Sequence, residues 1–364
     1  MASLPSLSGP AIALQQGLPY ERNKADPLVP AYVSKQPQQA QRRRDAAPIV
    51  QGIELVSTYE LPDRFRSIFP FPLFNAVQSR CFNTIYGSND NFVVSSPTGS
   101  GKTAVLELAI CRLINSFANG TFKIVYQAPT KSLCAERQRD WQKKFGPLDL
   151  PCAELTGDTE SVALKDVQRA SIIITTPEKW DSMTRKWKDN QRLFKMVQLF
   201  LIDEVHILKE ERGATLEAVV SRMKSVGSNV RFVALSATVP NSDDIAAWLG
   251  KEPTAQHLPA VREKFGEEFR PVKLQKHVCG YQGGLNDFAF EKLLNAKLPD
   301  VISKYSQRKP IMVFCFTRAS CVETAKLLAT LWSNEGPRER YWSAPRQLVA
   351  VGEKDLRGKS GHVH

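Results

Sequence analysis

The sequence lacks any long hydrophobic run. No stretch approaches the roughly 18–20 consecutive apolar residues that a membrane-spanning helix needs, and the first residues show no basic segment followed by a long apolar one. The seven cysteines include no Cys-x-x-Cys pair, and the five histidines show no metal-ligand spacing. We therefore expect a soluble, non-secreted protein of a reducing compartment, with no membrane span, disulfide framework or zinc site.

Acidic residues are in the minority, since 37 Asp and Glu stand against 49 Lys and Arg and give a formal net charge of +12. This excess favours a polyanionic partner, although many basic proteins bind none. The hydrophobic fraction of 42% is that of an ordinary globular chain and excludes wholesale disorder. The length of 364 residues predicts two domains, or one large domain with appendages.

Residues 1–60 are expected to form a disordered N-terminal tail. Proline and glutamine are frequent there, and the regular texture of short apolar runs begins only at about residue 65. The basic run at residues 42–44 is consistent either with a localisation or nucleic-acid signal or with a solvated charge cluster.

Short apolar runs rich in β-branched residues alternate with helix-like segments after residue 65. Because these runs are continuous rather than alternating, they predict an α/β fold with a parallel sheet covered on both faces. Ligands of such sheets collect at the carboxyl ends of the strands. The expected strands are at residues 92–94, 124–126, 172–174, 199–202, 232–235 and 311–314, and two expected helices are at 102–115 and 215–226.

A phosphate-binding loop follows the first apolar run. The octapeptide from Ser96 to Thr103 matches the pattern Gly-x-x-x-x-Gly-Lys-Ser/Thr except for Ser96 in place of the first glycine. Its glycines let backbone amides face phosphate oxygens, Lys102 would reach the β- and γ-phosphates, and Thr103 would ligate Mg²⁺. An ordinary glycine turn is the alternative interpretation. The residues expected to bind ATP here are Pro97, Thr98, Gly99, Ser100, Gly101, Lys102 and Thr103.

Two acidic residues follow the apolar run at 199–202. We expect Asp203 to hold Mg²⁺, partly through water, and Glu204 to act as the base toward the attacking water. Such a pair alone is common at a helix N-terminus, but together with the phosphate loop it predicts catalysis by Lys102, Asp203 and Glu204. His206 is either a structural residue or a coupling residue.

Three motifs in this order resemble the first main motifs of superfamily 2 helicases with a DEVH box. They are Lys102-Thr103, Asp203-Glu204-Val205-His206 and Ser236-Ala237-Thr238. The resemblance covers about residues 68–335 and implies a P-loop RecA-like domain followed by the beginning of a second one. It also implies ATP and Mg²⁺ as cofactors, adenine recognition by Gln78, and coupling through His206, Ser236 and Thr238.

Further loops resemble the motifs with which this family holds the backbone of a single nucleic-acid strand. Hydroxyls, amides and helix N-termini at strand ends suit phosphate oxygens. The residues that the resemblance assigns to nucleic-acid binding are Pro129, Thr130, Lys131, Gly157, Thr176, Pro177, Glu178 and Arg318.

Two stretches, at 212–217 and 241–250, resemble the Ski-like branch, and residues 74–82 and 270–276 are most similar to the meiotic crossover-promoting DNA helicases. This implies an ATP-dependent DNA helicase with 3′–5′ polarity, acting on single-stranded or branched DNA in the nucleus during meiotic recombination. The residues alone do not separate DNA from RNA, so an RNA helicase of the same branch is an alternative, and they identify no protein partner.

We expect a RecA-like ATP-binding domain at 61–260, and at 261–364 a linker, an incomplete second RecA-like domain and an irregular tail. Only 46 residues follow Arg318, whereas such a domain needs roughly 100–150. The expected explanation is a C-terminally truncated sequence, from a gene model or a splice form, and genuine natural shortening is the alternative. A non-unwinding, ATP-dependent nucleic-acid binding module is therefore a second alternative.

Overall fold

The computed structural model describes residues 47–117, 121–157, 163–186, 188, 191–226, 229–283, 286–307 and 309–333. The chain divides into two compact units, Met1–Lys273 and Leu274–His364, and each is described by itself. Most of the expected N-terminal tail and the expected irregular C-terminal tail lie outside the described residues.

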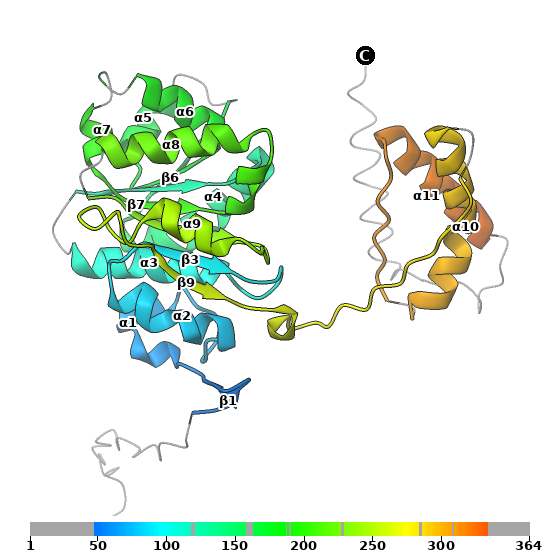
Figure 1. The fold of residues 1–364 in the computed structure, drawn as a ribbon, viewed down its shortest axis with the longest axis horizontal. Helices are drawn as coiled ribbons and strands as arrows, with labels where there is room; N and C mark the ends of the chain where they lie inside the picture. The colour runs from blue at the N-terminus through cyan, green and yellow to red at the C-terminus, as the bar shows by residue number, and fades with distance from the viewer. Residues whose placement is uncertain are drawn as a thin grey trace, which may run out of the picture. The chain divides into compact units, whose positions relative to one another are not determined.

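The first unit is built on a seven-stranded sheet in which every pairing is parallel (Figure 1). The order across the sheet is β5-β6-β4-β7-β8-β3-β9. The strands are β3 (Phe92–Ser95), β4 (Lys123–Gln127), β5 (Cys152–Leu155), β6 (Ile172–Thr175), β7 (Val197–Ile202), β8 (Arg231–Ser236) and β9 (Val261–Lys264). The α/β fold that the apolar runs predict is thereby confirmed.

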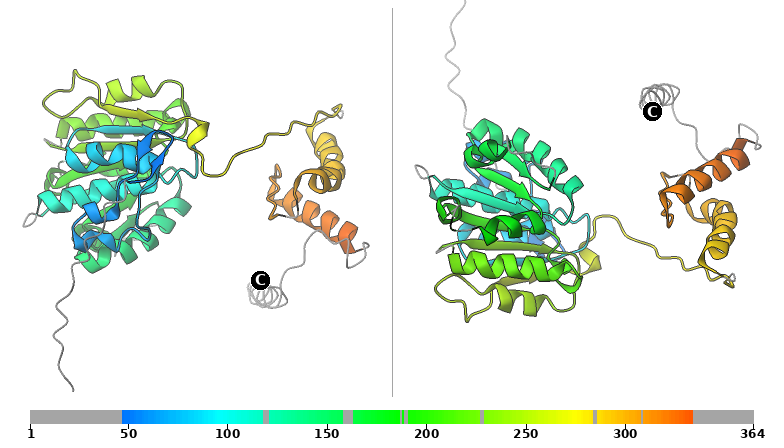
Figure 2. Two further views of the ribbon diagram at one scale, coloured as in Figure 1. Left: turned by 90° about the horizontal axis from the view of Figure 1, so that it is seen from below. Right: turned by 90° about the horizontal axis from the view of Figure 1, so that it is seen from above.

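Helices cover both faces of the sheet (Figure 2). Successive strand residues point to opposite faces, so in β4 Ile124 and Tyr126 enter one buried cluster and Val125 enters the other. The first cluster packs against α1 (Asp63–Arg66), α2 (Ala76–Gly87), α3 (Thr103–Ser116) and α4 (Lys131–Phe145). The second packs against α5 (Ala163–Arg169), α6 (Pro177–Arg185), α7 (Gln191–Lys195), α8 (Gly213–Val226) and α9 (Ser242–Leu249).

The structure departs from the expected boundaries of this unit at both ends. A hairpin of β1 (Ile49–Val50) and β2 (Ile53–Glu54) and the 3-10 helix η1 (Thr58–Glu60) lie within the segment expected to be disordered. At the other end, β9 pairs with β3, so the sheet continues past the expected boundary at residue 260. The pattern missed β9 because this edge strand is only half-buried and carries three charged residues.

The second unit contains α10 (Asp287–Tyr305) and α11 (Arg318–Ser333), whose contact buries Ile302 and Leu328. The prediction of a strand at residues 311–314 is wrong, because this segment pairs with no other strand among the described residues. Two of its apolar side chains, Met312 and Phe314, are 77% and 89% exposed. None of the helices in the described parts of the chain is long and apolar enough to cross a membrane.

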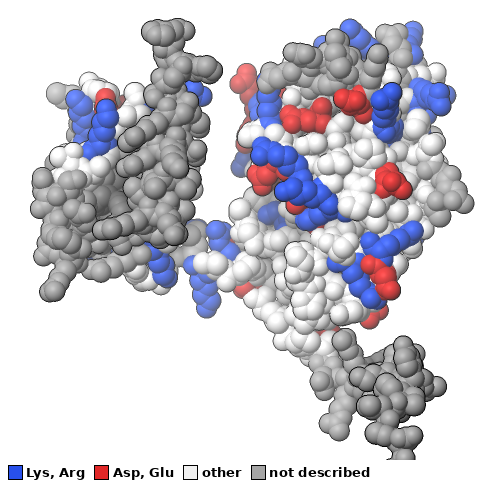
Figure 3. Space-filling model, turned by 180° about the vertical axis from the view of Figure 1, so that it is seen from behind, with Lys and Arg blue, Asp and Glu red and all other residues white. Residues whose placement is uncertain are grey.

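Charges on the surface of the first unit are mixed in sign on the face that Figure 3 shows. Basic side chains lie beside acidic ones over a largely uncharged surface, so the excess positive charge forms no continuous basic surface there.

Candidate active site

The loops at the carboxyl edge of the sheet form two groups. Those after β3, β7 and β8 carry the expected phosphate, catalytic and coupling residues, and those after β4, β5 and β6 carry all the expected nucleic-acid contacts except Arg318. The strand order keeps each group contiguous, and the groups meet where β4 pairs with β7. A single edge therefore presents both sets of residues.

The phosphate loop connects β3 to α3, which begins at Thr103. Gly99 and Gly101 have φ angles of +84° and +80°, a left-handed conformation that strains other residues. A Cβ on Gly101 would lie 2.5 Å from Nε2 of Gln78. The backbone conformation thus favours glycine at this position, and a side chain there would displace the Gln78 amide.

The N-terminus of α2 braces the phosphate loop. Asn75 and Gln78 form a capping box in which each side chain accepts from the backbone N–H of the other. Their amide nitrogens also donate to the loop, from Asn75 to the carbonyl of Ser100 (2.9 Å) and from Gln78 to that of Gly101 (3.0 Å). Adenine recognition by Gln78 stays a prediction, and the structure adds a bracing role for which Asn75 is equally needed.

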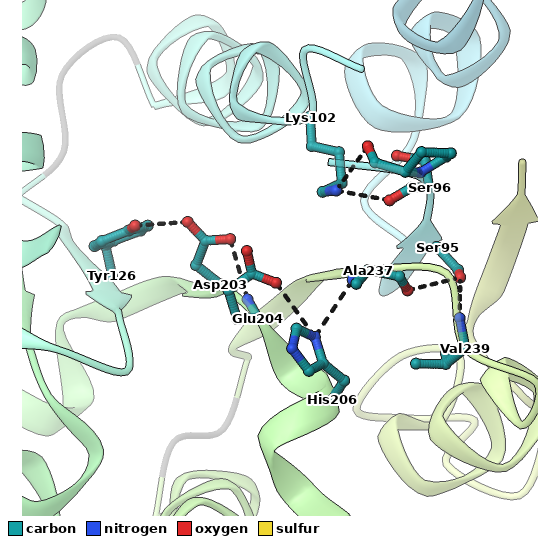
Figure 4. A network of polar contacts seen from close by, with 10 residues as sticks. Ser95, Ser96, Lys102, Tyr126, Asp203, Glu204, His206, Ala237 and Val239 are labelled. Carbon is teal, nitrogen blue, oxygen red and sulfur yellow. Dashed lines mark hydrogen bonds and ion pairs between the residues drawn. The ribbon is translucent and has the colours of Figure 1, made fainter. Parts of the chain in front are cut away.

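Lys102 folds back over its own loop (Figure 4). Its Nζ donates to the carbonyls of Ser96 (2.7 Å) and Pro97 (3.1 Å). Burial lowers the pKa of Lys102, while the carboxylates of Glu204 and Asp203 counteract that shift. The ammonium group therefore lies between carbonyls of the loop and the two acids, where a bound phosphate would compete for it.

Asp203 is held at both carboxylate oxygens. Its Oδ1 accepts from the backbone N–H of Glu204 (3.0 Å), and its Oδ2 accepts from the hydroxyl of Tyr126 (2.7 Å). Because each oxygen has two lone pairs and uses one, one lone pair on each is available to a cation or its water. Sequence reasoning found Asp203 but missed Tyr126, which lies 77 positions away on the neighbouring strand.

Glu204 marks a sharp change in backbone direction between β7 and the 3-10 helix η3 (Val205–Lys209). Its φ of +54° and ψ of +48° are left-handed, a conformation that costs free energy for a non-glycine residue and is frequent at functional sites. Burial raises the pKa of Glu204, and the adjacent Asp203 raises it further. A carboxylate with a raised pKa is a better proton acceptor, as the expected base requires.

His206 connects the acidic segment to the loop after β8. Its Nδ1 lies 3.2 Å from Oε2 of Glu204 and 3.3 Å from the backbone nitrogen of Ala237. This nitrogen can accept from Ala237 when unprotonated or donate to Glu204 when protonated, but not both at once. The contact fits the expected coupling role.

The loop after β8 is also tied to β3. The hydroxyl of Ser95 donates to the carbonyl of Ala237 (3.1 Å) and accepts from the N–H of Val239 (3.2 Å). Ser236 is fully buried, and its hydroxyl has no hydrogen-bond partner among the described residues, while Thr238 is exposed. Sequence reasoning missed Ser95, whose only signal was a polar residue ending an apolar strand.

The expected nucleic-acid contacts at Pro129, Thr130, Lys131 and Gly157 come together beside α4. Thr130 caps this helix by accepting from the N–H of Leu133. A Cβ on Gly157 would lie 3.5 Å from Nζ of Lys131, so the loops after β4 and β5 are in contact. Exposed Thr130 and Lys131 present a hydroxyl and a positive charge at a helix N-terminus.

The remaining expected contacts are divided between the two units. Thr176 and Pro177 are buried at the start of α6, and exposed Glu178 forms an ion pair with Arg212 (2.6 Å). Arg318 is the first residue of α11 in the second unit and is exposed there.

The residues at this edge fit Mg²⁺ and a nucleoside triphosphate. The Thr103 hydroxyl and Asp203 carboxylate are hard oxygen donors of the kind Mg²⁺ prefers. The left-handed Gly99 has no heavy atom within 4 Å of the position of a Cβ, which leaves room for phosphate beside the loop. Lys102 supplies the matching positive charge.

A protein-family comparison agrees with this geometry. The family described as DEAD/DEAH box helicase matches residues 75–245, which include α2, the phosphate loop, both carboxylates and the loop after β8. The chain carries a DEAD/DEAH box helicase domain. The predicted resemblance to DEVH-box helicases is thereby confirmed.

The helicase domain and its flanks are similar to helicases of yeast and human. Identity is 50% over 277 residues with ATP-dependent DNA helicase MER3 of Saccharomyces cerevisiae and 51% over 292 residues with probable ATP-dependent DNA helicase HFM1 of Homo sapiens. Each match covers 75% of this chain but only 23% and 20% of those proteins. RQC trigger complex helicase SLH1 of S. cerevisiae is 38% identical over 280 residues, 76% of this chain and 14% of that protein. The chain spans less than a quarter of the length of these relatives.

Solved helicase structures support the fold of the helicase domain. The DUF1998 helicase MrfA superposes with a TM-score of 0.55 at 20% identity, over 77% of this chain and 43% of that chain. At this identity the likeness concerns the fold alone.

Proposed function

We propose that this chain binds and hydrolyses ATP with Mg²⁺ and couples the reaction to movement on a single DNA strand. The observation that carries the proposal is the convergence of Lys102, Asp203 and Glu204 at the carboxyl edge where β3, β7 and β8 end (Figure 4). Identity of about half with MER3 and HFM1, whose names state ATP-dependent DNA helicases, supports DNA as the substrate.

The chain's own residues would divide the work. The phosphate loop and Lys102 bind the β- and γ-phosphates, and Thr103 and Asp203 hold the cation, which neutralises charge on the phosphates. Glu204 orients the attacking water and accepts its proton. His206 couples Glu204 to the loop after β8, because its Nδ1 can bond either to the Glu204 carboxylate or to the backbone N–H of Ala237.

The nucleic-acid strand would lie on the loops after β4, β5 and β6. Thr130, Lys131 and Gly157 offer a hydroxyl, a charge and a backbone approach to phosphate oxygens. The proposal includes 3′–5′ polarity, a role in meiotic recombination and a nuclear location. These three features rest on the resemblance to the meiotic helicases.

The experiment is ATP hydrolysis by the 364-residue chain, measured alone and with single-stranded DNA or RNA of the same sequence. We expect stimulation by DNA and loss of activity in Lys102→Ala, with Lys143→Ala, an exposed lysine on α4, as the matched control. Stimulation by RNA alone would favour the RNA helicase alternative. Hydrolysis unaffected by Lys102→Ala would contradict the site. A strand-separation assay on a DNA duplex with a 3′ overhang distinguishes a helicase from a non-unwinding module.

A further inference from the structure

Tyr126 joins the two groups of loops at the carboxyl edge. It lies on β4, the strand that leads into Pro129, Thr130 and Lys131, and it is fully buried. Its hydroxyl nevertheless reaches Oδ2 of Asp203 at 2.7 Å (Figure 4). The contact depends on the parallel pairing of β4 with β7, in which Tyr126 lies opposite Leu201, two residues before Asp203.

The ring of Tyr126 is fixed by two side chains of α4. Trp141 packs against it edge to face, with ring centroids 5.0 Å apart and an interplanar angle of 66°. The Arg137 guanidinium carbon lies 5.9 Å from the Tyr126 ring centroid and 5.5 Å from that of Trp141. Trp141 is itself anchored, because its Nε1 donates to Glu107 of α3 at 3.1 Å. The phenol therefore has one orientation in which its hydroxyl faces the carboxylate.

This hydroxyl determines how Asp203 presents its oxygens. The backbone N–H of Glu204 holds Oδ1, and without Tyr126 the carboxylate could pivot about that single contact. A hydrogen bond from a neutral donor to a charged acceptor is stronger than one between neutral groups. Such outer contacts orient ligating groups, and their loss typically reduces metal affinity 10- to 100-fold.

We propose that Tyr126 is a positioning residue that orients the Asp203 carboxylate toward nucleotide-bound Mg²⁺. It acts through Asp203 and touches neither the cation nor the nucleotide. The inference rests on the proposed function, since it assigns Asp203 to the cation. It also makes β4 a structural connection between the cation site and the loop that begins α4.

The test is Tyr126→Phe in the 364-residue chain, which removes the hydroxyl and keeps the ring. Binding of a fluorescent ATP analogue is measured without Mg²⁺ and during a Mg²⁺ titration. We expect unchanged affinity without Mg²⁺ and a rise of about tenfold or more in the Mg²⁺ concentration that gives half-maximal enhancement of binding. Tyr86→Phe is the matched control, because Tyr86 packs against Phe82 on α2, away from the carboxylates.

A double-mutant cycle shows whether the effect passes through Asp203. In an Asp203→Asn background, Tyr126→Phe should cause no further change in the Mg²⁺ titration. A Tyr126→Phe titration equal to that of wild type would overturn the proposal, as would equal loss of binding with and without Mg²⁺, which indicates a merely structural role. If Mg²⁺ does not change the nucleotide affinity of the wild-type protein, the result would instead contradict the proposed function.

Discussion

A buried carboxylate behind the phosphate loop makes the stability of the first unit depend on one lysine. Glu107 of α3 is 3% exposed and accepts from Nζ of Lys144 (2.7 Å) and from Nε1 of Trp141 (3.1 Å). Lys144 also lies 3.3 Å from Asp140. Because these residues connect α3 to α4, we predict that Lys144→Met destabilises the unit on which both groups of loops are built.

The magnitude follows from what remains after the substitution. Removing one partner of a buried ion pair costs about 3–5 kcal/mol, because the other charge stays buried without compensation. Trp141 still donates to Glu107, and the Lys144 side chain is 25% exposed, so the lower end of about 3 kcal/mol applies. For a domain of this size, that loss lowers the Tm by roughly 6–12 °C.

The loss should depend on pH with a defined sign. Burial raises the pKa of Glu107, and Lys144 opposes that shift, so Lys144→Met raises the pKa of Glu107 further. A carboxyl whose folded pKa exceeds its unfolded value contributes stability that is complete below the unfolded value and is lost as pH rises through the folded one. The destabilisation by Lys144→Met is therefore largest at high pH, where Glu107 is charged, and it shrinks as pH falls and Glu107 takes up a proton.

The assay is urea or thermal unfolding of wild type, Lys144→Met and Lys143→Met at several pH values between 5 and 8. Lys143 is exposed on the same helix and controls for the change of charge and side chain. A destabilisation by Lys144→Met no greater than that by Lys143→Met, or one constant across this pH range, would refute the reasoning.

Two further predictions concern binding and folding. Lys131→Ala should weaken binding of single-stranded DNA and reduce the slope of log affinity against log salt by about 0.7, because one phosphate contact is lost. Fluorescence anisotropy across a salt series measures this slope. An unchanged slope would show that Lys131 does not contact a phosphate. Limited trypsin digestion with mass-mapped products should leave a fragment that contains the seven-stranded sheet and retains ATP binding, whereas Leu274–His364 is degraded. The reason is that Ile302 and Leu328 are the only buried apolar side chains among the described residues of that unit. Equal resistance of both units would contradict the second prediction.

The sequence predicted the interior of the sheet because its strands are short, continuous apolar runs. In β4, Val125 and its neighbours are apolar on both faces, which only a covered parallel strand requires. β9 escaped prediction because its sequence Val261–Lys264 is mostly charged and its position at the edge demands little burial. Its assignment depends on pairing with β3, which no local pattern encodes.

The segment at residues 311–314 shows the opposite error. Its apolar side chains satisfy the pattern of a buried strand, but a strand forms only where a neighbour supplies hydrogen bonds, and the described residues supply none. Met312 and Phe314 remain exposed as a result. A hydrophobic pattern alone therefore indicates that a segment can form a strand, but it does not show that another strand is available to pair with it.

The candidate site was predictable where its chemistry is contiguous in sequence. Lys102 and Glu204 belong to short motifs that specify both residue type and context. Tyr126 and Ser95 could not be predicted from the sequence, because each bonds to a residue that follows a neighbouring strand, and the sequence does not state the strand order. Gln78 was predicted as an adenine contact, whereas its contact with the Gly101 carbonyl emerged only from the approach of α2 to the loop.

Glu204→Gln tests the central claim most directly, because it removes the base and keeps the shape of the side chain. ATP binding with Mg²⁺ is measured by calorimetry and hydrolysis by single-turnover assay on the 364-residue chain, beside Lys102→Ala. The account predicts that Glu204→Gln binds ATP as wild type does but no longer hydrolyses it, while Lys102→Ala loses binding. Hydrolysis by Glu204→Gln at the wild-type rate, or equal ATP affinity of wild type and Lys102→Ala, would contradict it.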